Sequence, residues 1–366
     1  MKPLYIVIAA LFIYPSAAGQ TAPHQTMPQL SINSDILSAQ IQAGEYGAIS
    51  SLWIEQSGQV LFSEYYRGTD EDSFHNMRSV GKTVTGMLLG AAIDDKLIEN
   101  TNVKAASYFN GLRPFANPDT RKDEITLSHL LTMSSGLECD DFNSFSRGNE
   151  ERMYLVEDWS KFYWDLPIKN RPSWEIPETD NSYDRFFTYC TAGAQLIGEI
   201  VERATGKTAE DYARSRLFAP VGITAPKWNY AATGKAHLGG GLELTTRDWA
   251  SVARLFVNDG LVNGKSVLSQ KWISASMTSY VQAENDTGYG YFLWRPDYQV
   301  QGQSYTANMM SGTGGNRIYI LPEFDITVVI TKMITAPEMA IAHQMPFLKR
   351  RSPPVLGSDL RWGVLG

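Results

Sequence analysis

The chain has 366 residues, of which 43% are hydrophobic, and a formal net charge of −7. This composition suits one large core or two closely packed subdomains, and it excludes a disordered or fibrous chain. The basic residues form only short, scattered runs, so the sequence lacks the electrostatic footprint of a protein that binds nucleic acid or an anionic membrane surface. We therefore expect small-molecule partners and no nucleic acid.

Residues 1–19 have the pattern of a signal peptide. Lys2 precedes an apolar run from Leu4 to Ile13, and small residues follow from Ser16 to Gly19. The alternative, a membrane anchor, is disfavoured because the run is too short to cross roughly 30 Å of hydrocarbon. The sequence predicts secretion or a periplasmic location, with no stable membrane anchor after signal cleavage.

The chain has two cysteines, Cys139 and Cys190. In an oxidising compartment an even count permits a disulfide bond. Such a bond would close a loop of about fifty residues and stabilise the fold by about 4 kcal/mol on chain-entropy grounds. Two buried thiols are the alternative, because a sequence does not show proximity. We predict that Cys139 and Cys190 form the disulfide bond.

The mature domain begins with a predicted β-hairpin over residues 47–68, where two aromatic and β-branched runs flank a Ser57-Gly58 turn. The stretch from Ser79 to Leu97 is apolar or small on most sides, which predicts an enclosed, central helix. Other helical patterns, several ending in Gly, occur in 127–136, 192–206, 209–222 and 246–260.

Two more strands are predicted near the end of the chain, over 316–322 and 325–333, followed by a helix over 336–347. Strands at both ends of a helical middle predict one α+β domain, a sheet with a helical insert, over residues 25–347. The tail, 348–366, is basic and interrupted by proline, and we assign it no role.

The stretch "MRSVGKTVTG", residues 77–86, admits two interpretations. Its Gly-Lys-Thr resembles the end of a phosphate-binding loop, but such a loop needs glycine where Asn76 stands, so that backbone N–H groups curl around the anion. The other interpretation is a nucleophile with its own base. Residues three apart share one face of a helix, so Lys82 would lie one turn above Ser79.

A lysine can activate a serine only when its amine is neutral. Moving the lysine pKa from ~10.4 to ~7 costs about 4.6 kcal/mol, which burial and neighbouring cations can supply. The enclosed helix around Ser79 offers such a site, and its positive end also disfavours the protonated amine. Without further support, a helix-capping Ser79 and a solvated Lys82 remain the alternative.

Support comes from a resemblance to the serine β-lactamase-related family, which includes class C β-lactamases, penicillin-binding carboxypeptidases, family VIII esterases and 6-aminohexanoate-dimer hydrolases. The resemblance covers residues from about 48 to 333. It rests on five segments in the family's order: "MRSVGKTVTGMLLGAAIDDKLI", "ITLSHLLTMSSGL", "FFTYCTAGAQLIGEIVERATGKTAEDYARSRLFAPVGI", "GGGLELTTRDWASVARLFVNDGLVNGKSVLSQKWI" and "SGTGGNRIYILPEFDITVVIT".

The resemblance implies a β-lactamase/transpeptidase-like fold with an antiparallel sheet built from N- and C-terminal strands. It implies that Ser79 is acylated, that Lys82 accepts its proton, and that Tyr189 passes a proton to the leaving group. A literal Tyr-x-Asn at Tyr108–Asn110 follows the nucleophile too closely, and we interpret it as coincidental. The five histidines have no metal-ligand spacing, so neither a metal nor a cofactor is expected.

The chain departs from the family's pattern in two places. Thr191 replaces the asparagine of the tyrosine motif, and its hydroxyl offers one donor where an amide offers two donors and an acceptor. The family's Lys-Thr-Gly element is absent, and residues 310–316 resemble the Gly-Gly form of the esterase and amide-hydrolase branch. Losing this lysine removes the anchor for a β-lactam carboxylate, worth ~1.5 to 3 kcal/mol. Efficient β-lactamase activity is therefore disfavoured.

The resemblance also implies donors for the developing oxyanion. They would be the backbone N–H of Ser79 and one from Gly314 to Asn316. The alternative is a Gly-rich turn that feeds an ordinary strand. The predicted substrate- and oxyanion-binding residues are Thr191, Thr313, Gly314, Gly315 and Asn316.

The leading functional hypothesis is an exported serine hydrolase that cleaves esters or small amides through an acyl-enzyme on Ser79. One alternative is a β-lactamase or D-alanyl-D-alanine carboxypeptidase acting on a lactam or peptide. Another is a binding protein on the same fold that has lost catalysis.

Overall fold

The computed structural model describes residues 30–169, 186–283, 287–300 and 303–333. The predicted signal peptide, the helix expected at 336–347 and the C-terminal tail lie outside these residues. The following description concerns the described part of the chain.

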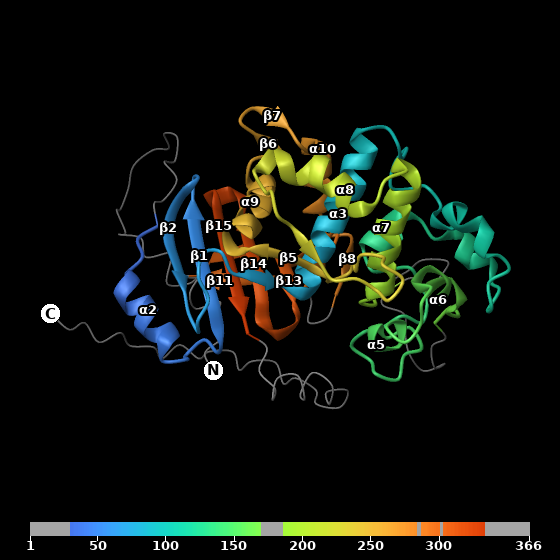
Figure 1. Cartoon of the computed structure of the whole chain (residues 1–366), viewed down its shortest axis with the longest axis horizontal. Coiled ribbons are helices and arrows are strands. Elements are labelled where there is room, and N and C mark those ends of the chain that lie inside the picture. Colours follow the sequence, from blue (N-terminus) through green and yellow to red (C-terminus); the bar gives the residue numbers. More distant parts are fainter. Residues whose placement is uncertain (1–29, 170–185, 284–286, 301–302, 334–366) are drawn as a thin grey trace.

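The main sheet has eight strands in the order β2-β1-β15-β14-β13-β10-β9-β8, and its neighbours pair antiparallel. The predicted hairpin pairs directly with the last described strand, and Leu52 lies opposite Ile330. This confirms the prediction of an antiparallel sheet that joins both ends of the domain (Figure 1). The strand bounds are β1 (Ile49–Gln56), β2 (Gln59–Tyr65), β8 (Val281–Gln282), β9 (Gly288–Tyr289), β10 (Trp294–Arg295), β13 (Asn308–Gly312), β14 (Asn316–Leu321) and β15 (Ile326–Lys332).

Helices cover both faces of this sheet, as the alternating side chains of β1 require. Leu52 and Ile54 join the hydrophobic cluster that contains helix α2 (Ser34–Gln42). Trp53 points to the opposite face and joins the larger cluster, which contains helix α9 (Thr246–Val257). The strand is therefore covered on both faces and buried along its whole length.

The helical part of the fold centres on α3 (Gly81–Asp94), which packs along α7 (Thr191–Thr205). Every residue from Gly81 to Ala92 is buried, which confirms the predicted enclosed helix. The helix starts later than predicted, however, and Ser79 lies in a 3₁₀ turn before it. Arg78 has a left-handed φ of 57°, which a right-handed α-helix does not accommodate.

Other predicted helices are shorter than the sequence pattern. The helix predicted over 127–136 ends at Leu131, two residues before Met133 adopts a positive φ of 55°. The helix predicted over 209–222 is divided, because a π-helical turn follows Ala213. The remaining helices are α4 (Leu127–Leu131), α5 (Glu150–Met153), α6 (Trp159–Asp165), α8 (Ala209–Ala213) and α10 (Gln270–Ser276).

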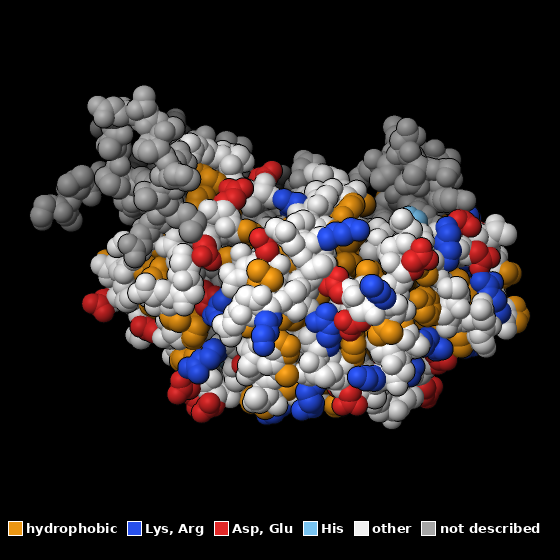
Figure 2. Space-filling view, turned by 90° about the horizontal axis from the view of Figure 1, so that it is seen from above, with side chains coloured by type: hydrophobic (Ala, Val, Ile, Leu, Met, Phe, Trp, Pro, Cys, Tyr) orange, Lys and Arg blue, Asp and Glu red, His pale blue; other side chains and the backbone are white. Residues whose placement is uncertain are grey.

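Seven short strands lie outside the main sheet: β3 (Phe74–Asn76), β4 (Lys227–Trp228), β5 (Leu242–Thr245), β6 (Leu261–Val262), β7 (Lys265–Ser266), β11 (Asp297–Val300) and β12 (Gln303–Thr306). The β3-β5-β4 sheet leads directly into the nucleophile turn, because β3 ends two residues before Arg78. Within the described ranges, no helix is both long and apolar enough to span a bilayer. Figure 2 shows acidic and basic side chains interspersed over one face of the molecule.

Candidate active site

The nucleophile and its base are brought together at the start of α3. Ser79 is partly exposed, whereas Lys82 is only 1% exposed. The Lys82 Nζ lies 2.8 Å from the Ser79 Oγ and donates a hydrogen bond to the carbonyl oxygen of Gly239 at 2.6 Å. Gly239 begins a run of three glycines, residues 239–241, which we call the glycine turn and which fixes the amine next to the hydroxyl.

Two opposing effects set the pKa of Lys82. Burial lowers it, because a charged amine loses its hydration in the interior. The carboxylates of Glu150 and Asp141 act in the opposite direction. Burial is the larger effect, so the pKa of Lys82 lies below that of an exposed lysine. A neutral amine that can accept the Ser79 proton is therefore accessible.

Tyr189 is the third residue at this point, and it lies just before α7. Its ring is 7% exposed and stacks on Phe142 at 5.1 Å and on Trp294 at 5.7 Å between centroids. The Lys82 Nζ lies 5.1 Å from the ring centroid. Burial raises the pKa of Tyr189, and a hydrogen bond with the Ser79 side chain opposes that shift. At neutral pH the phenol therefore keeps its proton, which it can donate.

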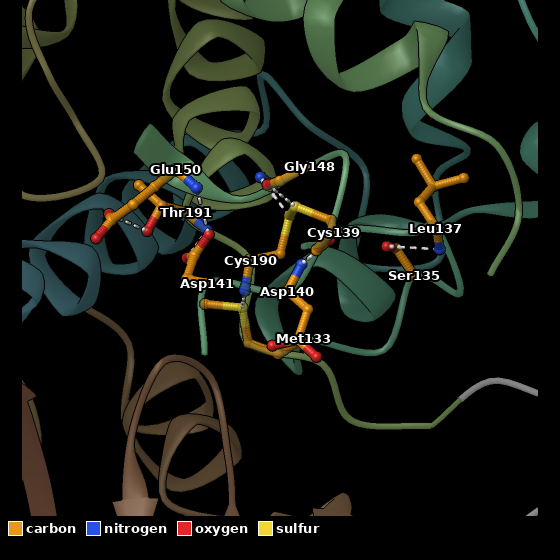
Figure 3. The surroundings of a disulfide bond; sticks show 12 residues. Met133, Ser135, Leu137, Cys139, Asp140, Asp141, Gly148, Glu150, Cys190 and Thr191 are labelled. Carbon is orange, nitrogen blue, oxygen red and sulfur yellow. Dashed lines mark hydrogen bonds between the residues drawn. A yellow bond between two sulfur atoms is a disulfide. The ribbon is translucent and has the colours of Figure 1, made fainter. Parts of the chain in front are cut away.

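A disulfide joins Cys139 to Cys190, next to Tyr189 in the chain, with Cα atoms 5.3 Å apart (Figure 3). The neighbouring Asp141 binds the same segment. Its backbone N–H donates to the Tyr189 carbonyl oxygen at 2.9 Å. Its carboxylate accepts the Thr191 N–H at 2.7 Å and the Glu150 N–H at 2.9 Å. Residues 139–141 thus hold residues 189–191 covalently and by hydrogen bonds.

Thr191, predicted to bind substrate, is the first residue of α7 and is fully buried. Its hydroxyl donates to Glu150 Oε2 at 2.9 Å, and Figure 3 shows the two side chains meeting. This group therefore serves an internal contact, and the Thr191 side chain links α7 to α5.

Asp141 and Glu150 form a half-buried acidic pair that sequence reasoning missed. Burial, together with the charge of Glu150, raises the pKa of Asp141 to about 7. The one feature of the sequence that could have indicated Asp141 was its position, two residues after Cys139. The predicted bond from Cys139 to Cys190 brings the two segments together. The acids were not selected because the bond alone does not show which residues after Cys139 turn toward Tyr189.

The other four predicted binding residues lie at the turn between β13 and β14. Thr313 to Gly315 form a 3₁₀ turn. The Asn316 side chain donates to the Thr313 carbonyl oxygen and accepts the Lys332 N–H, each at 2.9 Å. Gly315 lies against the Lys332 side chain. The described contacts of these side chains hold the turn against β15, and the predicted oxyanion role of the segment stays a prediction.

Gly312, which sequence reasoning did not select, contacts the nucleophile turn directly. A Cβ at this position would lie 1.9 Å from the carbonyl oxygen of Met77, so only glycine fits. The backbone of β13 therefore reaches the turn that carries Ser79.

His237 is a second residue that the sequence did not single out. Its ring packs edge-on against Tyr154 and Trp159. Burial and the nearby charge of Lys82 lower the pKa of His237 to about 3, so the ring is neutral. Its carbonyl oxygen accepts the Gly241 N–H at 2.8 Å. His237 thus supports the glycine turn that binds Lys82.

The literal Tyr-x-Asn match lies elsewhere. Tyr108 to Asn110 belong to a 3₁₀ segment spanning Ala105–Leu112, where the Asn110 amide donates to the Ser107 carbonyl oxygen. That hydrogen bond is local, three residues along the chain. The described contacts around Ser79 involve Tyr189 instead.

Comparison with known proteins finds relatives in sequence and in fold. A 6-aminohexanoate-dimer hydrolase from Paenarthrobacter ureafaciens is 25% identical over 312 residues, which cover 78% of this chain and 72% of the relative. A penicillin-binding protein from Bacillus halodurans has a similar structure, with a TM-score of 0.59 at 17% identity, covering 84% of this chain and 98% of that one. A family VIII carboxylesterase gives a TM-score of 0.60 at 16% identity, covering 85% and 94%.

The family model described as β-lactamase matches residues 43–342, which is most of the chain and includes every residue of the site above. The chain therefore belongs to the β-lactamase family, and it is an enzyme of the serine hydrolase class that this family comprises.

Proposed function

We propose that this enzyme is exported and cleaves esters or small amides through an acyl-enzyme on Ser79. One observation carries the proposal: a buried amine with a lowered pKa lies 2.8 Å from the Ser79 hydroxyl, which also bonds to Tyr189. This arrangement places a base, Lys82, and a proton donor, Tyr189, each in hydrogen-bond contact with the nucleophile, Ser79.

The pKa of Lys82 is lowered and that of Tyr189 is raised, and these opposite shifts indicate that Lys82 accepts a proton and Tyr189 donates one. Lys82 takes the proton of Ser79 while Oγ bonds to the substrate carbonyl carbon, and the carbonyl oxygen becomes an oxyanion. When the tetrahedral intermediate collapses, Tyr189 protonates the departing alcohol or amine and regains a proton from Lys82. Water then adds to the acyl-Ser79, and the same groups return its proton to Oγ as the acid leaves.

Two features favour esters or small amides over β-lactams. Residues 310–316 contain no lysine to anchor a lactam carboxylate. The Thr191 hydroxyl, at the position where the family has an asparagine, donates a hydrogen bond to Glu150 and is thereby engaged within the protein. The similarity to a hydrolase that acts on an aminohexanoate dimer is consistent with amide cleavage.

Incubation with p-nitrophenyl butyrate tests the proposal. We expect p-nitrophenolate release and a butyryl adduct on Ser79 by intact mass and peptide mapping. Ser79→Ala should abolish both, whereas the control Ser251→Ala, on helix α9, should retain both. Folded protein that forms no adduct would contradict the proposal. Faster turnover of a chromogenic cephalosporin than of any ester would replace the ester assignment by β-lactamase activity.

Export rests on the signal-like residues 1–19 and on the disulfide, since such bonds persist in oxidising compartments. Expression of the full chain, followed by cell fractionation and N-terminal sequencing, tests it. The exported protein should start after residue 19, and a Leu11→Asp change in the apolar run should retain it in the cytoplasm. Recovery of the uncut chain from the cytoplasm would refute export.

A further inference from the structure

Arg78, the residue directly before the nucleophile, has an unusual backbone. Its φ of 57° lies in the left-handed region, which is unfavourable for a residue with a Cβ. The Asn76 side chain accepts the Arg78 N–H at 2.8 Å and so supports this conformation. Glycine would adopt it without strain, so the position holds an arginine at an energetic cost. Such costs are concentrated at functional sites.

The surroundings of Arg78 place it at the reacting centre. A Cβ on Gly312 would lie 3.4 Å from the Arg78 Cβ, and a Cβ on Gly240 would lie 3.5 Å from the Arg78 carbonyl carbon. Arg78 therefore lies between β13 and the glycine turn that binds Lys82. Its positive charge also acts on the half-buried ring of His237.

The Arg78 side chain is exposed to solvent. Over the residues that the structure describes, its guanidinium group has no hydrogen bond, ion pair or ring contact. Arg317 differs: its Nη1 donates to the carbonyl oxygens of Gly312 at 2.6 Å and Asn316 at 2.7 Å. Gly312 thus lies between the guanidinium group of Arg317, which is engaged by the backbone, and the Cβ of Arg78.

The carboxylates described near the site are engaged by groups other than Arg78. The Asp141 carboxylate accepts the N–H groups of Thr191 and Glu150, and Glu150 accepts the Thr191 hydroxyl. Over the described residues, the exposed guanidinium group next to Ser79 is therefore open to solvent or substrate.

We propose that Arg78 binds a carboxylate of the substrate, so that the enzyme prefers esters or amides that carry a carboxylate. Guanidinium groups recognise carboxylates through paired, charge-assisted hydrogen bonds. The cation comes from the nucleophile turn and not from β13, where residues 310–316 contain no lysine. This inference rests on the proposed acyl-enzyme function and specifies its substrate class.

Two matched ester pairs test the preference. In the first, p-nitrophenyl pentanoate is compared with the p-nitrophenyl hemiester of glutaric acid, which carries the carboxylate on the acyl side. In the second, phenyl acetate is compared with the acetate ester of p-hydroxybenzoic acid, which carries it on the leaving group. We expect a higher kcat/KM for the anionic member of at least one pair, and a smaller preference at high ionic strength.

Arg78→Gln should lower the anionic-to-neutral ratio of kcat/KM by roughly ten- to a hundredfold, the range for loss of one charge-assisted hydrogen bond. The loss should be mainly in KM, and Arg78→Lys should restore part of it. Arg67→Gln is the matched control, because Arg67 is exposed, has a φ of 58° and follows edge strand β2. It removes the same charge and should leave the ratio unchanged.

If Arg78→Gln does not fold, Arg78→Gly replaces it, since glycine suits the positive φ. Absence of any anionic preference in the wild type, or its survival in the Arg78 variants, overturns the inference while a butyryl-Ser79 adduct still supports the proposed function. Failure of every ester to acylate Ser79 refutes the proposed function itself.

Discussion

At the scale of single residues, two opposing effects determine the protonation state of the catalytic lysine. Burial favours the neutral amine of Lys82, whereas the carboxylates of Glu150 and Asp141 favour the ammonium form. The enzyme therefore keeps negative charge near a residue that must lose its proton. The same two carboxylates hold the start of α7 through Thr191. They therefore help to position Tyr189, while they also raise the pKa of Lys82 and so disfavour its neutral form.

Glu150→Gln should move the rising limb of the kcat/KM–pH profile to lower pH by about one unit. The limb reports loss of the Lys82 proton, and removing a negative charge makes the ammonium form less stable. The glutamine oxygen can still accept the Thr191 hydroxyl, so the geometry is kept. Glu151→Gln, on the exposed side of the same helix, is the control and should leave the limb in place. A shift to higher pH would contradict this account.

Tyr189→Phe should lower kcat by about 10² to 10⁴-fold with little change in thermal stability. The phenylalanine ring can keep the stacking on Phe142 and Trp294, while the proton donor is lost. Steady-state kinetics and a melting curve measure both effects. Tyr289→Phe, in the same aromatic cluster, should remain active. Full activity in Tyr189→Phe would remove this residue from the mechanism.

At the scale of elements, three short segments build the site: the 3₁₀ turn before α3, the residues before α7 and the segment from Cys139 to Asp141. The last two are joined by the disulfide, which closes a loop with a sequence separation of 51. The bond reduces the conformational entropy of the unfolded chain. Because it lies next to Tyr189, it also restricts the position of this proton donor in the folded enzyme.

The double variant Cys139→Ser, Cys190→Ser should lose about 4 kcal/mol of unfolding free energy, the chain-entropy value for such a loop. It should also lose kcat, because Tyr189 is less firmly placed. Urea unfolding and ester kinetics check the two effects. Reductant should weaken the wild type and leave the double variant unchanged. Equal stability of the two proteins would show that the bond contributes little.

At the scale of the whole molecule, contacts between the chain ends support the site. Strands β1 and β15 form adjacent strands of the sheet, and α9 packs on them. A buried ion pair locks this helix in place: Arg254 on α9 donates to both carboxylate oxygens of Glu55 on β1, at 2.8 and 2.6 Å. The Trp53 indole donates to the same carboxylate at 2.9 Å.

Glu55→Gln should lower the unfolding free energy by about 2 to 3 kcal/mol, because it leaves Arg254 without its partner charge. The control is Glu71→Gln, which breaks an exposed pair between Glu71 and Arg247 of the same helix and should cost at most about 0.5 kcal/mol. Denaturant titration measures both. Equal losses in the two variants would mean that burial of the Glu55 pair does not matter.

The sequence alone predicted features that depend on local geometry. Hydrophobic periodicity indicated the terminal strands and the enclosed α3, and the spacing of Ser79 and Lys82 predicted their contact because three residues make about one helical turn. Strands at both ends of a helical middle predicted the α+β class, and the family's motif order added its β-lactamase/transpeptidase-like form.

Only the tertiary structure decided how distant segments meet. The cysteine count predicted the Cys139–Cys190 bond, which the structure confirms. The hydrogen bond from Asp141 to Tyr189, the engagement of Thr191 by Glu150 and the approach of Gly312 to the nucleophile turn also join residues far apart in the chain, and these were not predicted. Local pattern carries no information on such pairs, because chain packing and loop closure determine which of many possible partners lies within hydrogen-bond distance.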